Sequence, residues 1–171
     1  MPETRNKPST GTVRLHRVLR APAERVYKAF IDPDAMVKWM PPHGFTGKMH
    51  SMNARVGNGG GYKMSFTNFS TGSSHSFGGT FTELSPPAKG NSSGAEARIR
   101  YTDGFDVPAV SPMAGEMQVT ITMKNVMCGT ELTIVQEGVP AVIPVEMCYL
   151  GWQESLTMLT NLVEAQIPDD G

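Results

Sequence analysis

Residues 145–166, VEMCYLGWQESLTMLTNLVEAQ, decide the fold, because they hold the only long helical pattern in the chain. Apolar residues recur there at spacings of three and four, which places them on one side of a helix. They are Val145, Tyr149, Trp152, Leu156, Leu159 and Val163. Pro144 suits the first turn, and Pro168 closes the run. At about 1.5 Å per residue, this helix would span about 33 Å, enough to cross a small sheet.

Gly151 interrupts this helix at a cost of about 1 kcal/mol relative to alanine. Small and flexible side chains, those of Met147, Gly151, Ser155 and Met158, form a strip beside Trp152. Two explanations fit a glycine here. It allows a close contact between helix and sheet, leaves room for a ligand, or does both.

The composition predicts a single domain that binds neither nucleic acid nor an anionic membrane. The chain has 171 residues, with 15 basic and 16 acidic side chains and a formal net charge of −1. No apolar run is long enough for a membrane span, and the N-terminus lacks a signal-peptide core. Two cysteines without a CxxC motif indicate neither a disulfide framework nor a metal. We therefore expect a cytoplasmic protein without a cofactor, as a monomer or a homodimer, with a domain over 13–167 and short tails at 1–12 and 168–171.

The remaining chain predicts one strand, two short helices and then about six antiparallel strands. The first strand covers 13–20. The first helix starts at Ala21-Pro22, and the second runs from Pro33 to Met40 with Asp32 as its cap. From Phe45 onward the pattern alternates with a period of two, which is typical of strands. These strands are expected at 45–54, 62–67, 75–84, 95–102, 117–124 and 131–137.

Such a sheet has an apolar face to bury, and only the C-terminal helix is long enough to cover it. Glycine-rich bends allow strong curvature, and a curved sheet around one helix leaves a space between them. Ligand sites favour such concave apolar spaces. The segment 103–115, with two prolines and two glycines, is expected to be a mobile flap near the opening.

Five stretches, taken in order, resemble a known family over about residues 13–166. They are KWMPPHGFT (38–46), RVG (55–57), GTFTELSPP (79–87), GTELT (129–133) and GWQESL (151–156). The order of elements resembles the helix-grip fold of the SRPBCC superfamily, an α+β fold shared by START domains, birch-pollen-allergen-like proteins and polyketide cyclases. The stretches themselves resemble its branch of activators of heat-shock protein 90 ATPase homologues. Asn53 stands where that family often has an acidic residue, and Met40 where it usually has a second tryptophan.

The resemblance implies binding of a hydrophobic or amphipathic small molecule, such as a lipid. Some relatives catalyse cyclisation or aromatisation. Chaperone-activating members carry a further N-terminal domain, for which this chain has no room. A chaperone partner and a role in the stress response are therefore the weaker inferences.

Candidate catalytic groups are few, since no nucleophile elbow or phosphate-binding loop occurs. His43 could act as an acid or base at the pocket mouth, or lie exposed in a turn. Glu83 could point inward with a raised pKa, or pair with Arg98 or Arg100. Asp103 and Asp106 could bind a cation or a polar ligand, or simply be solvated.

The expected ligand-binding residues are mostly large and apolar, together with the small residues of the helix. They are Trp39, Phe45, Met64, Phe66, Phe81, Tyr101, Met117, Gly151, Trp152, Ser155 and Leu156. Binding without catalysis is the main functional hypothesis. A cyclase or hydrolase that uses His43 or Glu83, and a module that acts on a chaperone, are the alternatives.

Overall fold

The computed structural model describes residues 10–88 and 96–168 and contains three helices and an eight-stranded antiparallel sheet. The strands are β1 (Gly11–Leu19), β2 (Phe45–Asn53), β3 (Gly61–Asn68), β4 (Ser74–Gly79), β5 (Phe81–Ser85), β6 (Glu96–Phe105), β7 (Met117–Val126) and β8 (Gly129–Val139). The helices are α1 (Ala23–Ile31), α2 (Pro33–Trp39) and α3 (Val145–Val163). A curved sheet around a C-terminal helix confirms the predicted helix-grip fold. The predicted tails lie mostly outside the described residues, although β1 already begins at Gly11.

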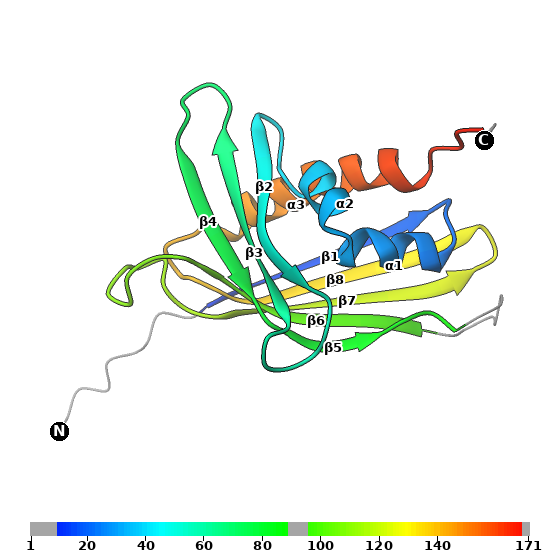
Figure 1. Ribbon diagram of the computed structural model, residues 1–171, viewed down its shortest axis with the longest axis horizontal. Coiled ribbons are helices and arrows are strands. Elements are labelled where there is room, and N and C mark those ends of the chain that lie inside the picture. Colours follow the sequence, from blue (N-terminus) through cyan, green and yellow to red (C-terminus); the bar gives the residue numbers. More distant parts are fainter. Residues whose placement is uncertain (1–9, 89–95, 169–171) are drawn as a thin grey trace.

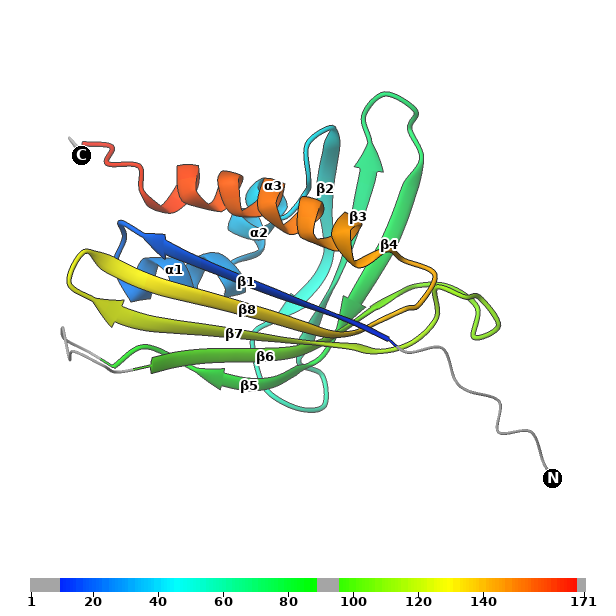
Figure 2. The same ribbon diagram turned by 180° about the vertical axis from the view of Figure 1, so that it is seen from behind.

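The sheet is strongly bent, and α3 crosses its open side (Figure 1). Its strand order is β1-β8-β7-β6-β4-β3-β2, with β5 paired to β6. β2, β3 and β4 rise at a steep angle to the other strands in both views (Figure 2). At the bend, only Phe77 and Gly78 of β4 pair with Phe105 and Gly104 of β6. The sheet therefore supplies two walls that face α3.

The predicted strand 75–84 is wrong as a single strand, because the chain breaks at Thr80 into β4 and β5. Glycines allow the crowding at this point. A methyl group on Gly79 would lie 1.7 Å from the carbonyl oxygen of Thr102, and one on Gly78 would lie 2.2 Å from that of Tyr62. This close approach lets β4 and β5 pair with different parts of β6, and so adds a strand to the expected number.

β6 is longer than the sequence predicts and takes in the start of the supposed loop. It runs to Phe105, and Asp103 pairs with Met117 of β7. The alternation of Tyr101, Asp103 and Phe105 continues because β6 still has neighbouring strands here: β7 as far as Asp103, and β4 opposite Phe105. The prediction of Asp103 as a loop residue is therefore wrong. The rest of that loop lies between β6 and β7.

Two short helices close one end of the space between sheet and α3. Asp32 caps α2 as predicted: its Oδ1 accepts hydrogen bonds from the backbone N–H groups of Asp34 (2.9 Å) and Ala35 (3.3 Å). The indole of Trp39 is fully buried and donates to the carbonyl oxygen of Ala29 at 2.8 Å. This bond fixes α2 against α1.

α3 ends at Val163, three residues before the predicted end at Gln166. Residues 165–168 are exposed, so continuing the helix would bury no further apolar surface. The Arg25 side chain of α1 donates to the carbonyl oxygen of Val163 at 2.8 Å. A cation at a helix C-terminus also interacts favourably with the helix dipole.

The core packs most tightly against the C-terminal half of α3. Leu156, Leu159 and Val163 are almost completely buried there against α1, α2 and the sheet. The N-terminal half differs, since Met147 and Leu150 are exposed. Tight packing at one end and incomplete packing at the other leave a space under the first turns of α3.

Candidate functional site

A cavity of about 760 Å³ lies between the N-terminal half of α3 and the bent sheet. The sheet contributes residues from β3, β4, β6, β7 and β8, and α2 with three connecting loops completes the wall. The lining residues are Trp39, Met40, Pro42, Phe66, His75, Phe77, Tyr101, Asp103, Phe105, Met113, Met117, Gln136, Val142, Ile143, Pro144, Met147, Cys148, Gly151, Trp152 and Ser155. Aromatic and aliphatic side chains dominate, as in sites for apolar ligands.

Gly151 borders this space without touching the sheet. A methyl group placed on Gly151 would have no atom within 4 Å, leaving aside the helix's own nearby backbone. This result decides between the two explanations for the glycine: it does not serve a close helix–sheet contact. The small side chain instead widens the cavity beside Trp152.

Trp152 joins α3 to the sheet through a hydrogen bond at the cavity wall. Its Nε1 donates to Oε1 of Gln136 in β8 at 2.9 Å. Gln136 is buried, and its Nε2 contacts Sδ of Met117 at 3.4 Å. Trp152 therefore anchors α3 to the sheet while it lines the cavity, and the polar ends of both side chains are satisfied.

Asp103 is a carboxyl group in a largely apolar wall. Its Oδ1 accepts hydrogen bonds from the Tyr62 hydroxyl at 2.9 Å and from the backbone N–H of Gly104 at 3.0 Å. Burial raises the pKa of Asp103 from 3.8 to about 6, although these two hydrogen bonds act in the opposite direction. Burial first, and then the nearby Asp103, raise the pKa values of Tyr62 and Tyr101 well above 10. Both tyrosines therefore stay neutral.

Among the described residues of the wall, the other titratable groups are His75 and Cys148. Partial burial lowers the pKa of the His75 imidazole, which disfavours its cationic form. Burial likewise raises the pKa of the Cys148 thiol, which keeps it protonated at neutral pH. Among the residues that the structure describes, no lysine or arginine lines the cavity. The described wall is therefore mostly apolar, with Asp103 as its acidic side chain.

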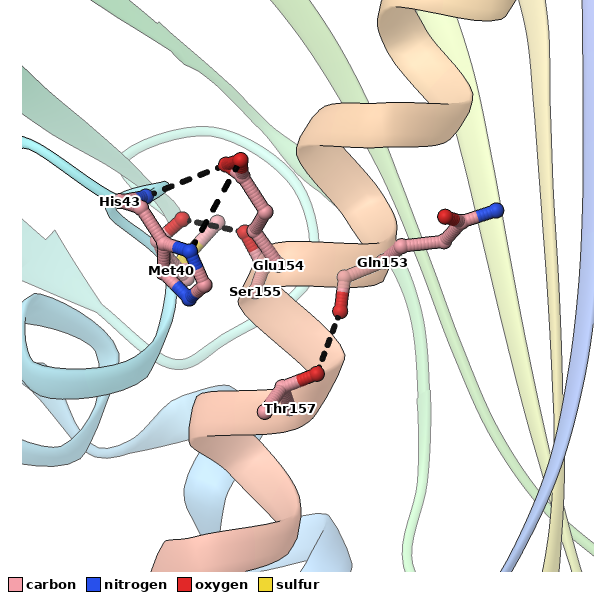
Figure 3. Close-up of polar contacts among 6 residues, drawn as sticks. All are labelled: Met40, His43, Gln153, Glu154, Ser155 and Thr157. Atoms are coloured by element: carbon pink, nitrogen blue, oxygen red, sulfur yellow. Dashed lines mark hydrogen bonds and ion pairs between the residues drawn. The ribbon is translucent and has the colours of Figure 1, made fainter.

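The loop between α2 and β2 is fastened to α3 next to the cavity (Figure 3). The Ser155 hydroxyl donates to the carbonyl oxygen of Met40 at 2.6 Å. Oε2 of Glu154 accepts from the backbone N–H of His43 at 3.2 Å, and its Oε1 lies 3.9 Å from Nδ1 of the same histidine. Met40 and Pro42 are thereby held at the rim.

The structure places most of the predicted ligand-binding residues on the cavity wall. They are Trp39, Phe66, Tyr101, Met117, Gly151, Trp152 and Ser155. Met64, Phe81 and Leu156 instead lie fully buried in the core, and half-buried Phe45 packs against His75. Met64, Phe81 and Leu156 are absent from the wall because the core fills the space around them.

His43 and Glu83 lie away from the cavity wall. The His43 side chain is 60% exposed in the turn after α2. Glu83 lies opposite Arg100 across β5 and β6, beyond a register shift, and accepts a hydrogen bond from Ser85 at 3.2 Å. The pairing position with Arg100 is one of the alternatives that the sequence left open.

Several wall residues were missed by sequence reasoning, among them His75, Phe77, Phe105 and Gln136. A continued alternation after Tyr101 would have found Asp103 and Phe105. Phe77 of β4 alternates with Phe81, but the alternation does not show which of the two borders the cavity, because that depends on the bend of the sheet.

A second hollow, of about 580 Å³, lies at the junction of β1 with α1 and the turn between β7 and β8. None of the described residues around it is aromatic, so it offers a ligand less apolar surface. No group of at least three metal-binding side chains occurs within residues 10–88 and 96–168. Of the helices described, none has the length and apolar character of a membrane span.

Comparison with known proteins places this geometry in a family. Residues 20–164 match the family model described as Activator of Hsp90 ATPase homolog 1-like protein. The crystal structure of protein CV1439 from Chromobacterium violaceum is 53% identical, covers 91% of this chain and 99% of its own, and has a TM-score of 0.78. No curated protein matches significantly.

More distant structures share the fold. A protein from Rhodobacter sphaeroides is 18% identical over 93% of this chain and 99% of its own, with a TM-score of 0.70. The AHSA1 protein from Silicibacter pomeroyi is 17% identical over 88% and 96%, with a TM-score of 0.69. The match of the family model and the 53% identical structure establish the relationship: this chain belongs to the family of activator of Hsp90 ATPase homolog 1-like proteins.

Proposed function

We propose that this protein binds a hydrophobic or amphipathic small molecule in the cavity beneath the N-terminal half of α3. A volume of about 760 Å³ lies within the range of roughly 300–1,000 Å³ that is usual for small-molecule sites. Rings from α2, three strands of the sheet and α3 surround it, so an apolar ligand would exchange water for aromatic contacts.

The observation that carries this proposal is the open space at Gly151. A glycine inside a helix costs about 1 kcal/mol relative to alanine, and no steric contact requires it here. The C-terminal half of the same helix packs on the core without such a gap. The space is therefore local to the cavity and is not a general looseness of α3.

The two residues that the sequence offered as acids or bases do not lie on the cavity wall, so their positions do not support the cyclase or hydrolase that would use them. His43 contacts Glu154 at the surface, and Glu83 is engaged with Ser85, so neither reaches the cavity wall. General acid–base catalysis needs a side chain within hydrogen-bonding distance of the reacting group.

The test is titration with the neutral fluorescent probe N-phenyl-1-naphthylamine, combined with native mass spectrometry for a co-purified ligand. Gly151→Leu should stay folded and weaken probe binding by about tenfold or more, since its side chain occupies the cavity. Gln153→Leu is the matched control, because it adds leucine to the same helix at an exposed position. Figure 3 shows that Gln153 points away from Met40 and His43, which contact α3. Equal binding by wild type and a folded Gly151→Leu protein would contradict the proposal. An assay of Hsp90 ATPase stimulation separates it from the activity named in the family's description.

A further inference from the structure

The carboxyl group of Asp103 has one oxygen that the protein uses and one that it does not. Oδ1 accepts two hydrogen bonds, from the Tyr62 hydroxyl and from the backbone N–H of Gly104. Within the described residues, Oδ2 has no hydrogen-bond or ion-pair partner. Asp103 lines the cavity, so this second oxygen is available to a molecule inside it.

The described basic side chains near Asp103 do not form an ion pair with it. Lys63 lies on β3 next to Tyr62, but its Nζ contacts Oδ2 of the exposed Asp106 at 3.0 Å. His75, on the cavity wall, is disfavoured as a cation because partial burial lowers its pKa. With no lysine or arginine among the described lining residues, the chain supplies no counter-charge to Asp103 within the cavity.

The walls around this acid suit a cation with an apolar body. Six aromatic residues line the same cavity: Trp39, Phe66, Phe77, Tyr101, Phe105 and Trp152. Aromatic faces attract ammonium groups through their quadrupoles, and a charge-assisted hydrogen bond to a carboxylate is about twice as strong as a neutral one. A carboxylate ligand would meet like charge and find no cation to receive it.

We propose that Asp103 recognises the head group of the ligand, and that the ligand is an amphipathic amine whose protonated nitrogen donates to Oδ2. This inference rests on the proposed function and specifies its ligand class. The apolar body would extend from Asp103 along the aromatic wall toward Gly151 and Trp152.

The experiment compares three eight-carbon molecules that differ only in their head group: octylamine, 1-octanol and octanoate. Each is used to displace N-phenyl-1-naphthylamine from the wild-type protein at neutral pH. Octylamine should displace the probe at a concentration at least about tenfold lower than 1-octanol, with octanoate the weakest. Asp103→Asn keeps the shape of the side chain and should reduce the preference for octylamine over 1-octanol to about twofold or less.

Asp34→Asn is the matched control, because it makes the same chemical change at an exposed acid of α2 that is not among the cavity-lining residues. It should leave the preference for octylamine unchanged. Equal displacement by octylamine and 1-octanol in wild type would overturn the inference, and this arm needs no variant to fold. An amine preference that survives in a folded Asp103→Asn protein would overturn it as well. If the probe and all three molecules fail to bind, the proposed function fails too. If 1-octanol binds without any amine preference, only the head-group assignment is lost.

Discussion

Replacing Gly151 with alanine should stabilise the protein. The added methyl group meets no atom within 4 Å, and the backbone there is ordinary helix. The variant therefore gains helix propensity without a steric cost. The difference between glycine and alanine inside a helix is about 1 kcal/mol. For a domain of this size, 1 kcal/mol corresponds to a rise in Tm of about 2–4 °C.

The assay is thermal unfolding followed by circular dichroism, repeated with chemical denaturation to obtain the free energy of unfolding. Gly79→Ala is the matched control, since it makes the same chemical change where a methyl group would lie 1.7 Å from the Thr102 carbonyl oxygen. That variant should lose about 1–3 kcal/mol or more. A Gly151→Ala protein that melts clearly below wild type would show that residue 151 is closely packed, and the argument for an open wall would fail.

Three further predictions concern the other parts of the site. Because the pKa of Asp103 is about 6 in the folded protein and 3.8 is its ordinary value, the folded state binds more protons between these values, and wild-type stability should fall as pH rises through this window. The difference of about two pH units corresponds to about 3 kcal/mol. The free energy of unfolding of Asp103→Asn should therefore equal that of wild type near pH 4 and exceed it by up to this amount at pH 8. Parallel pH profiles of the two proteins would contradict this. Trp152→Ala should lower the free energy of unfolding by about 3 kcal/mol, as its ring packs on the core and its Nε1 bonds to Gln136, and an unchanged denaturant midpoint would refute the anchoring role. Amide hydrogen exchange in residues 106–116 should be fast in the free protein and slower with octylamine bound, because Met113 of this loop lines the cavity, whereas strong protection without ligand would argue against a mobile flap.

Local patterns were sufficient to predict the fold. The period of α3, the alternation of the strands and the cap at Asp32 are each set by a few neighbouring residues, and the structure bears them out. Each pattern reports which side of an element is buried. A long amphipathic helix after a run of strands must cover their apolar face, so the helix-grip arrangement follows from the order of the elements.

The cavity depended on contacts between residues far apart in the chain. Periodicity shows that a side chain points inward, but it does not distinguish packed core from the wall of a space. Met64 and Phe81 follow the same alternation as Phe66 and Tyr101, yet the first two lie in the core and the other two line the cavity. That difference arises from the bend of the sheet at β4 and β6, where glycines let backbones approach.

The position of Asp103, a polar residue, could not be predicted from local sequence either. Read locally, it belongs to a stretch rich in glycine and proline and is expected to be exposed. Its burial comes from Tyr62, 41 residues earlier, and from pairing with Met117 of β7. The sequence by itself determined the elements and their order, because those depend on local periodicity. Only the tertiary structure decided where space remains beneath α3 and which acid faces it, because both depend on how well distant surfaces fit together.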